Sequence, residues 1–555
     1  MAMILQGLQR LTAVKLEKWQ IGVICSTPFV IGLMTIGARK ILAAKSTPAQ
    51  KLALSKEAMI HAAAGKTCYR NEKYKDAVLC YGKALDKCPK DQHTNMAMLL
   101  HSRAEAYEML HKWDKVLEDC TESLAYCPHY FKAYARRARA HEALNNITDS
   151  LDDITACCIL ELFQNNHSIV FADRILQLTG RADAVEELAS RAPIVPSLFC
   201  FDSYMRPFFA DPLQTINVPP RSLVKTPNAF VRAYWALRDR HFDEIIPACT
   251  EEIESPESSG YRLEALLMRG TFYLLSNAFK ESKHDFGAII DNPNAGATLC
   301  AYAYMRRATV NYYMNDKAAA VADFDAAEKI QPSNPDVYFQ RALTQLPLDP
   351  AEALTQLKKT VALAPRHAVA VINMYYADYR ASIIAGALSK KRMEVVMRSF
   401  EETIMEFPHC VECYNLMAQM LVDRQDFPKA QEYFVKALEL EPSNSSVIVQ
   451  HALMVLQWRG DKEMASEMLK QAIAANPHCQ QAYETLGTIE VQRAHLKEAV
   501  ELFDQAIRCC KSYDDLTHAF ALRNASQAQI NVTEKLGIDI KGMNESVQQH
   551  LSSLD

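Results

Sequence analysis

The sequence predicts an all-α fold, in which about eleven repeated helix pairs form a superhelix behind one N-terminal transmembrane helix. Three observations support this prediction. Glycine supplies only 16 of the 555 residues, less than half of its usual share of roughly 7%, which disfavours strand-and-turn folds and glycine-looped nucleotide folds. Apolar residues recur at helical spacing throughout the chain after residue 56. One long uncharged stretch lies near the N-terminus.

The uncharged stretch, WQIGVICSTPFVIGLMTIGA, covers residues 19–38 and follows a short N-terminal segment, residues 1–18. As a helix it would be about 30 Å long, which is enough to cross a bilayer. More lysine and arginine residues follow the span, in a basic linker at 39–56, than precede it, so we expect the bulk of the chain to face the cytosol. A cleaved secretory signal ending near Ala43 is the alternative, but such signals have shorter apolar regions, so we favour an uncleaved anchor.

Beyond the linker, a proline recurs after each predicted pair of helices. A period near 34 residues, with small side chains at positions 8, 20 and 27, a large one at position 24 and proline at position 32, is the tetratricopeptide pattern. The small residues let the two helices approach closely, and the large ones fill the space between repeats. The repeat that starts at residue 301 has all five features, in Ala308, Ala320, Phe324, Ala327 and Pro332.

The period fails between residues 165 and 226, and seven prolines follow one another closely from Pro193 to Pro227. Proline removes a backbone donor and clashes with the preceding turn, so this stretch cannot be one continuous helix. We therefore predict an N-terminal repeat domain at 57–164, a proline-rich helical connector at 165–226, a C-terminal repeat domain at 227–530 and a tail at 531–555.

The composition and the net charge exclude several classes of protein. With 49% hydrophobic and 23% charged residues, the chain has the composition of a globular protein. Its formal net charge of −5 gives no general attraction to nucleic acid. The 16 cysteines occur singly, as two adjacent pairs and as one C-x-x-C motif, which in a chain this long indicates reduced thiols in the cytosol.

No motif in the sequence predicts an enzyme. Gly65-Lys66-Thr67 resembles the end of a phosphate-binding loop, but the other glycine of that motif would have to stand at Ile60. Cys410 and Cys413 lie beside His409 without a second pair at zinc spacing, so we interpret them as buried small residues at a helix start. We predict no enzymatic activity, no cofactor and no metal, and expect the array to be a binding surface.

Four segments carry a resemblance to one family. They are WDKVLEDCTESLAYC at 113–127, RRARAHEAL at 136–144, CCILELFQN at 157–165 and YETLGTIEVQR at 483–493. Together with the anchor, the three early repeats, the proline-rich break and the longer second array, they resemble the animal members of the chaperone-docking receptor family of the mitochondrial outer-membrane translocase, the TOM complex. The resemblance covers nearly all of the chain after residue 56.

The resemblance implies that the N-terminal repeats hold the C-terminal Glu-Glu-Val-Asp tails of the Hsp70 and Hsp90 chaperones. The family's five tail-binding positions fall here on Ala62, Lys66, Ser102, Lys132 and Arg136. Only Lys132 and Arg136 keep the family's residue types, whereas Lys66 and Ser102 can still donate hydrogen bonds and Ala62 cannot. The sequence therefore predicts a weakened clamp, and a solvated basic stripe is the alternative for Lys132 and Arg136.

In this family the second array receives the precursor protein. Methionine and aromatic side chains interspersed with amides and carboxylates suit apolar or amphipathic segments of varied sequence. Applying the same helix positions to the second array predicts a groove wall made of Met305, Arg306, Tyr312, Tyr313, Glu412, Asn415, Gln450, Met454, Trp458, Gln481, Glu484 and Thr488.

The function that the resemblance implies is that of a receptor in the mitochondrial outer membrane. It would cross the membrane once, bind precursor proteins on the cytosolic side with Hsp70 and Hsp90 as escorts, and pass them to other TOM complex subunits. The alternative is a membrane-tethered tetratricopeptide scaffold or co-chaperone adaptor that takes no part in import.

Overall fold

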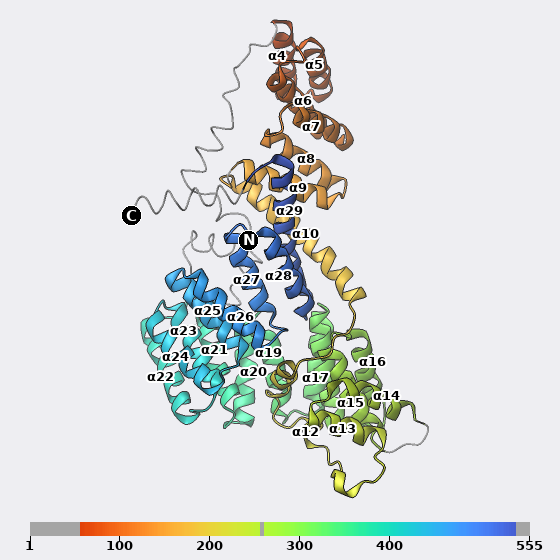
Figure 1. The fold of residues 1–555 in the computed structure, drawn as a ribbon, viewed down its shortest axis with the longest axis vertical. Coiled ribbons are helices and arrows are strands. Elements are labelled where there is room, and N and C mark those ends of the chain that lie inside the picture. The colour runs from red at the N-terminus through yellow and green to blue at the C-terminus, as the bar shows by residue number, and fades with distance from the viewer. Residues whose placement is uncertain (1–55, 162, 256–259, 540–555) are drawn as a thin grey trace.

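The computed structural model describes residues 56–161, 163–255 and 260–539, and this part of the chain contains 26 α-helices and two short 3-10 helices (Figure 1). None of these helices combines the length and the apolar character needed to cross a bilayer. The predicted segments at 1–18 and 19–38, and nearly all of the linker at 39–56, lie outside the described residues.

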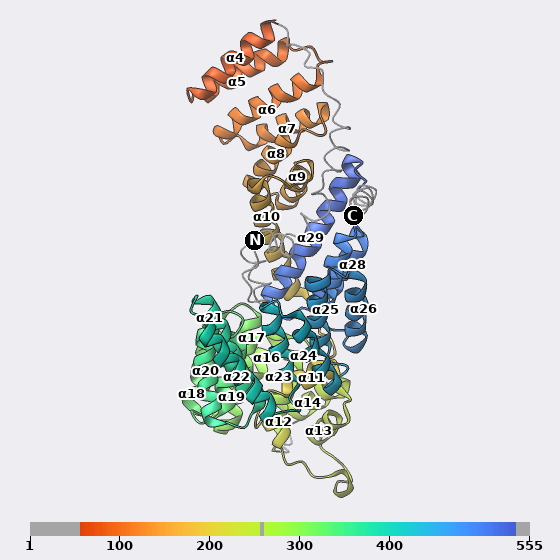
Figure 2. The same ribbon diagram turned by 90° about the vertical axis from the view of Figure 1, so that its left-hand side faces the viewer.

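The N-terminal array consists of three antiparallel helix pairs at one end of the elongated molecule (Figures 1 and 2). These helices are α4 (Lys56–Arg70), α5 (Tyr74–Lys87), α6 (His93–Met109), α7 (Trp113–Tyr126), α8 (Phe131–Ala143) and α9 (Ile147–Leu160).

A long helix and then an irregular stretch connect the two arrays. Asn165 caps the start of the long helix by accepting a hydrogen bond from the backbone N–H of His167 at 3.1 Å. The prolines predicted to break helical structure all follow its end, as expected. The connector contains α10 (Asn166–Ser190), α11 (Leu198–Met205), α12 (Pro212–Thr215) and the 3-10 helix η1 (Arg221–Leu223).

The C-terminal array contains eight helix pairs and a final long helix, so the two arrays together give the eleven repeats that the period predicts. Its elements are α13 (Ala229–Asp239), η2 (Phe242–Glu244), α14 (Ile245–Glu254), α15 (Arg262–Leu275), α16 (Phe279–Ile290), α17 (Ala297–Tyr313), α18 (Lys317–Ile330), α19 (Pro335–Gln345), α20 (Pro350–Leu363), α21 (Ala368–Ile384), α22 (Lys390–Glu406), α23 (Val411–Asp423), α24 (Phe427–Leu440), α25 (Ser445–Arg459), α26 (Lys462–Ala475), α27 (Gln480–Gln492), α28 (Leu496–Cys509) and α29 (Tyr513–Leu536).

Small side chains on first helices meet large ones on second helices, as the repeat pattern requires. A Cβ atom added at Gly270 would lie 2.7 Å from the ring of Phe286, and one added at Gly487 would lie 2.7 Å from the ring of Phe503. Real Cβ atoms do not approach other atoms so closely, so only glycine fits at these points. The glycine therefore sets the distance between the two helices of its pair.

A second repeated contact joins the helices of four pairs. An arginine on the first helix donates two hydrogen bonds, of 2.6–2.9 Å, to both oxygens of an aspartate 16 residues later on the second helix. This paired geometry fixes the guanidinium and the carboxylate in one plane. The pairs are Arg103–Asp119, Arg137–Asp153, Arg269–Asp285 and Arg307–Asp323.

The final helix, α29, returns to the N-terminal half and packs beside α9 and α10 (Figures 1 and 2). Cys157, Ile175 and Ala525 belong to one apolar core, so this core crosses the predicted domain boundary at residue 164. Asn524 also donates a hydrogen bond of 2.6 Å to Asp183. Because α29 continues to Leu536, the segment predicted as a tail from residue 531 begins inside a helix.

Gly180 on α10 provides a test of this contact. An added Cβ would lie 2.5 Å from the backbone oxygen of Thr517 on α29, and a backbone atom cannot move aside as a side chain can. Gly180→Ala should therefore destabilise the full chain by about 1–3 kcal/mol and lower its thermal unfolding midpoint. Hydrogen exchange should show faster opening of α10 and α29.

Gly82 on α5 is the matched control, because an added Cβ there would meet nothing within 4 Å. Gly82→Ala should stabilise the chain by about 0.5–1 kcal/mol through helix propensity alone. Equal midpoints for the two variants would show that α10 and α29 are not packed so closely.

Candidate functional site

The first candidate site is the face formed by the first helices of the N-terminal array, α4, α6 and α8 (Figure 2). Lys66 on α4 and Lys132 on α8 are exposed, so both ammonium groups are available to a ligand. Ser102 on α6 is half-buried, and its hydroxyl donates to the backbone oxygen of Met98 at 2.8 Å. Its only hydrogen is thus already used within the helix.

Arg136 on α8 lies in an internal network and is only 7% exposed. Its Nε donates to Glu108 at 2.7 Å, and one terminal nitrogen donates to the backbone oxygen of His101 at 2.9 Å. Glu105 lies 3.4 Å from the other terminal nitrogen. Two carboxylates of the protein therefore compensate the charge of this guanidinium.

His101 completes this network. Burial and the neighbouring Arg136 lower the pKa of the His101 imidazole to about 3, so the ring is neutral at physiological pH. A neutral ring nitrogen can accept a hydrogen bond, and Nε2 lies 2.9 Å from the guanidinium of Arg136. The network holds Arg136 by groups that a chaperone tail would have to displace.

The second candidate site is the predicted groove wall of the C-terminal array, and part of it is buried. The prediction applied the helix positions of the first array to the second array and assumed an open groove there. Several of these side chains pack inside the array instead. Met305, Arg306, Asn415 and Met454 are at most 5% exposed. The structure thus corrects the expectation that these four line a groove.

The connector covers Arg306, which is completely buried on α17. Asp211 of the connector forms an ion pair with Arg306 and also caps α12 by accepting the N–H of Leu213 at 2.8 Å. Asp336 on α19 accepts the backbone N–H groups of Phe209 and Ala210, at 2.8 and 3.2 Å. The connector therefore covers the part of α17 that the sequence analysis predicted to face a bound precursor.

The other predicted groove residues remain at least partly accessible to solvent. Gln450 and Trp458 lie half-buried on α25, whereas Gln481 on the neighbouring α27 is exposed. Glu412, Tyr312, Tyr313, Glu484 and Thr488 are half-buried.

Tyr313 and Glu484 are far apart in the sequence, yet both lie near Asp515 at the start of α29. Burial raises the pKa of Glu484 to about 8, which favours its neutral form below that pH. The Nζ atom of Lys317 lies 4.0 Å from a carboxylate oxygen of Asp514. The start of α18 therefore also lies near the start of α29. The structure thus gathers part of the predicted wall where α17, α27 and α29 meet.

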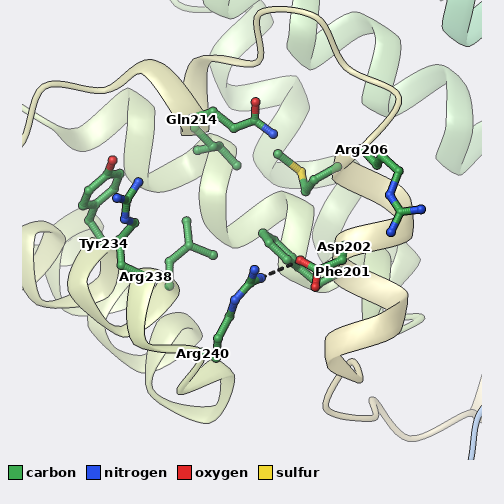
Figure 3. Close-up of a pocket in the computed structure, with 10 residues that line it drawn as sticks. Phe201, Asp202, Arg206, Gln214, Tyr234, Arg238 and Arg240 are labelled. Carbon is green, nitrogen blue, oxygen red and sulfur yellow. Dashed lines mark hydrogen bonds and ion pairs between the residues drawn. The ribbon is translucent and has the colours of Figure 1, made fainter. Parts of the chain in front are cut away.

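The sequence analysis missed a pocket of about 590 Å³ between the connector and α13 (Figure 3). Its buried lining is apolar, and three arginines stand around it. Arg240 is bound to Asp202 at 2.6 Å and Arg206 to Glu441 at 3.0 Å, whereas Arg238 bonds to no residue of the described chain. The lining residues are Phe201, Asp202, Met205, Arg206, Leu213, Gln214, Tyr234, Leu237, Arg238 and Arg240.

No repeat pattern marks this pocket, because six of its ten lining residues come from the connector, where the period fails. The available sequence signal was the pair of arginines, Arg238 and Arg240, at the end of one predicted helix.

Comparison with known proteins identifies the family. Tetratricopeptide repeat models match residues 411–444 and 459–514. The mitochondrial import receptor subunit TOM70 of Rattus norvegicus is 35% identical over 487 residues, which cover 85% of this chain and 79% of the rat protein. The Homo sapiens TOM70 subunit is 34% identical with the same coverage. The crystal structure of yeast Tom70 is similar at 21% identity and a TM-score of 0.46, covering 86% of this chain and 97% of that chain. Because the rat and human proteins match most of its length, this chain belongs to the family of the mitochondrial import receptor subunit TOM70.

Proposed function

We propose that this chain is a receptor that binds mitochondrial precursor proteins at the outer membrane and passes them to the translocase for import. The observation that carries the proposal is the 35% identity to the rat import receptor subunit over 85% of the chain. The architecture supports it, because stacked helix pairs present an extended surface to another protein. We expect no enzymatic activity from such a receptor.

The membrane anchor is proposed for residues 19–38, with both arrays in the cytosol. Residues 1–45 fused to a fluorescent protein should be sufficient for location at mitochondria, and protease added to intact mitochondria should remove the arrays of the full chain. Thr27→Arg with Phe29→Arg should release the chain, because each central arginine costs about 2.5–3.5 kcal/mol of insertion free energy.

Ser46→Arg with Thr47→Arg adds the same charge outside the span and should leave the location unchanged. Protected arrays would contradict the topology, and a location at another organelle would favour the tethered scaffold over the import receptor.

For chaperone tails we propose weak binding that depends on Lys66 and Lys132. Two exposed cations suit the carboxylates of a Glu-Glu-Val-Asp tail, whereas Arg136 is already compensated by Glu105 and Glu108. Arg136→Ala would be a poor test. It removes the hydrogen bond that Arg136 donates to the Glu108 carboxylate, and the loss of this partner would disturb the fold.

Lys132→Ala should weaken binding of a Glu-Glu-Val-Asp peptide about tenfold, since a charge-assisted hydrogen bond contributes about 1.5–3 kcal/mol. Affinity of the unsubstituted chain should fall as salt rises, because exposed charges are screened over about 8–10 Å. Ala62→Lys with Ser102→Asn should strengthen binding. Calorimetric titration measures all three.

Lys83 on α5 is exposed on a second helix, so Lys83→Ala is the control and should not change the affinity. Indistinguishable affinities for Lys132→Ala, Lys83→Ala and the double variant would mean that this face does not bind chaperone tails.

For precursors we propose binding along α25 and α27, continuing to the pocket in Figure 3. The ion pair of Arg206 with Glu441 joins the pocket to the end of α24, next to α25 in the chain. Buried apolar side chains with arginines around them suit apolar segments flanked by acidic groups. The exposed amides of Gln214 and Gln481 lie at these two places.

A photoreactive amino acid at Gln481 or at Gln214 should cross-link a bound hydrophobic carrier precursor, because both positions are exposed and neither supports the core. The same amino acid at Lys470, exposed on the second helix α26, is the control and should give only background. Cross-links obtained only from the N-terminal array, for example from position Lys132, would contradict the assignment.

A further inference from the structure

The C-x-x-C motif lies at the junction between α22 and α23. Cys410 caps the start of α23, and Cys413 is the third residue of this helix. The backbone N–H of Cys413 donates to the backbone oxygen of Cys410 at 3.1 Å. Such a bond closes a single turn and brings the two Cα atoms within about 7 Å, near the 4.4–6.8 Å that disulfides span.

The two sulfur atoms have different surroundings. Cys410 is half-buried, and the neighbouring Cys413 thiol and the backbone N–H groups at the start of α23 lower the pKa of the Cys410 thiol. The adjacent Cys410 sulfur and burial raise the pKa of the Cys413 thiol, which is completely buried. Cys410 is thus suited to react first, with Cys413 directly behind it.

A metal site does not explain the pair. Within the described residues, only Glu490, His495 and Glu498 converge closely enough to hold an ion, and Arg493 already binds Glu490 there at 2.6 Å. His409 does not join the two cysteines in any such cluster. A pair of thiols with no third ligand is suited to redox chemistry rather than to zinc.

We propose that Cys410 and Cys413 form a thiol–disulfide exchange site, whose substrates are low-molecular-weight or protein disulfides. The Cys410 thiolate attacks one sulfur of the substrate disulfide and forms a mixed disulfide, and the released thiolate takes up a proton. Cys413 then loses its proton and attacks the Cys410 sulfur, which releases the second thiol. Two cysteine thiols are oxidised to one disulfide, and the substrate is reduced to two thiols.

The site is tested on the full chain with oxidised glutathione as the probe. After acid quenching and alkylation of free thiols, trypsin releases residues 399–424, a peptide with Cys410 and Cys413 as its only cysteines. We expect this peptide to become lighter by two hydrogens and to resist alkylation until a reductant is added.

Cys300 is the matched control for the rate. It is also half-buried in the first turn of a helix, but its thiol donates to the oxygen of Ala295 and burial raises its pKa. Cys410 should be modified measurably faster than Cys300, because its lowered pKa leaves more of the thiol as the reactive thiolate.

Two variants separate the steps. Cys413→Ala should retain glutathione on Cys410 as a stable mixed disulfide, because no second thiol can release it. Cys410→Ala should leave Cys413 unmodified. The proposal is overturned if Cys410 reacts no faster than Cys300, or if Cys413→Ala accumulates no mixed disulfide. Circular dichroism of each variant checks that its overall helix content is unchanged.

Discussion

The contact between a small residue on the first helix of a pair and a larger side chain on the second is the constraint on which the rest of the structure depends. Gly270 against Phe286 and Gly487 against Phe503 bring the helices so close that no Cβ fits between them. This distance fixes where the neighbouring pair can pack. It also places arginine and aspartate side chains such as Arg269 and Asp285 in bonding range, so packing and polar contacts repeat together.

Repetition alone would give an open spiral, and two non-repeating elements change this. The connector inserts Asp211 beside the buried Arg306, and α29 returns to pack on α9 and α10. A buried ion pair contributes little net stability, but loss of one partner leaves an uncompensated charge, which makes the seating of the connector specific. The two arrays are consequently not independent domains, since they share the core around Ile175 and Ala525.

The same two elements determine which charged groups can meet a partner. Arg136 and Arg306 both appear as free cations in the sequence, but each is neutralised by carboxylates from another helix or from the connector. Lys66 on α4 and Lys132 on α8, by contrast, remain exposed. The proposed tail site therefore relies on lysines, which lack the planar two-bond geometry of arginine.

The sequence by itself determined the helical repeats, their number and the proline break, because helical spacing, small-to-large pairs such as Ala308 and Phe324, and proline act over short stretches of chain. Only the tertiary structure decided that Met305 and Arg306 are buried, that α29 closes onto α10, and that connector residues such as Phe201 build a pocket with α13. The physical reason is that these outcomes depend on contacts between segments distant in the chain, and no periodic pattern records which segment covers which helix.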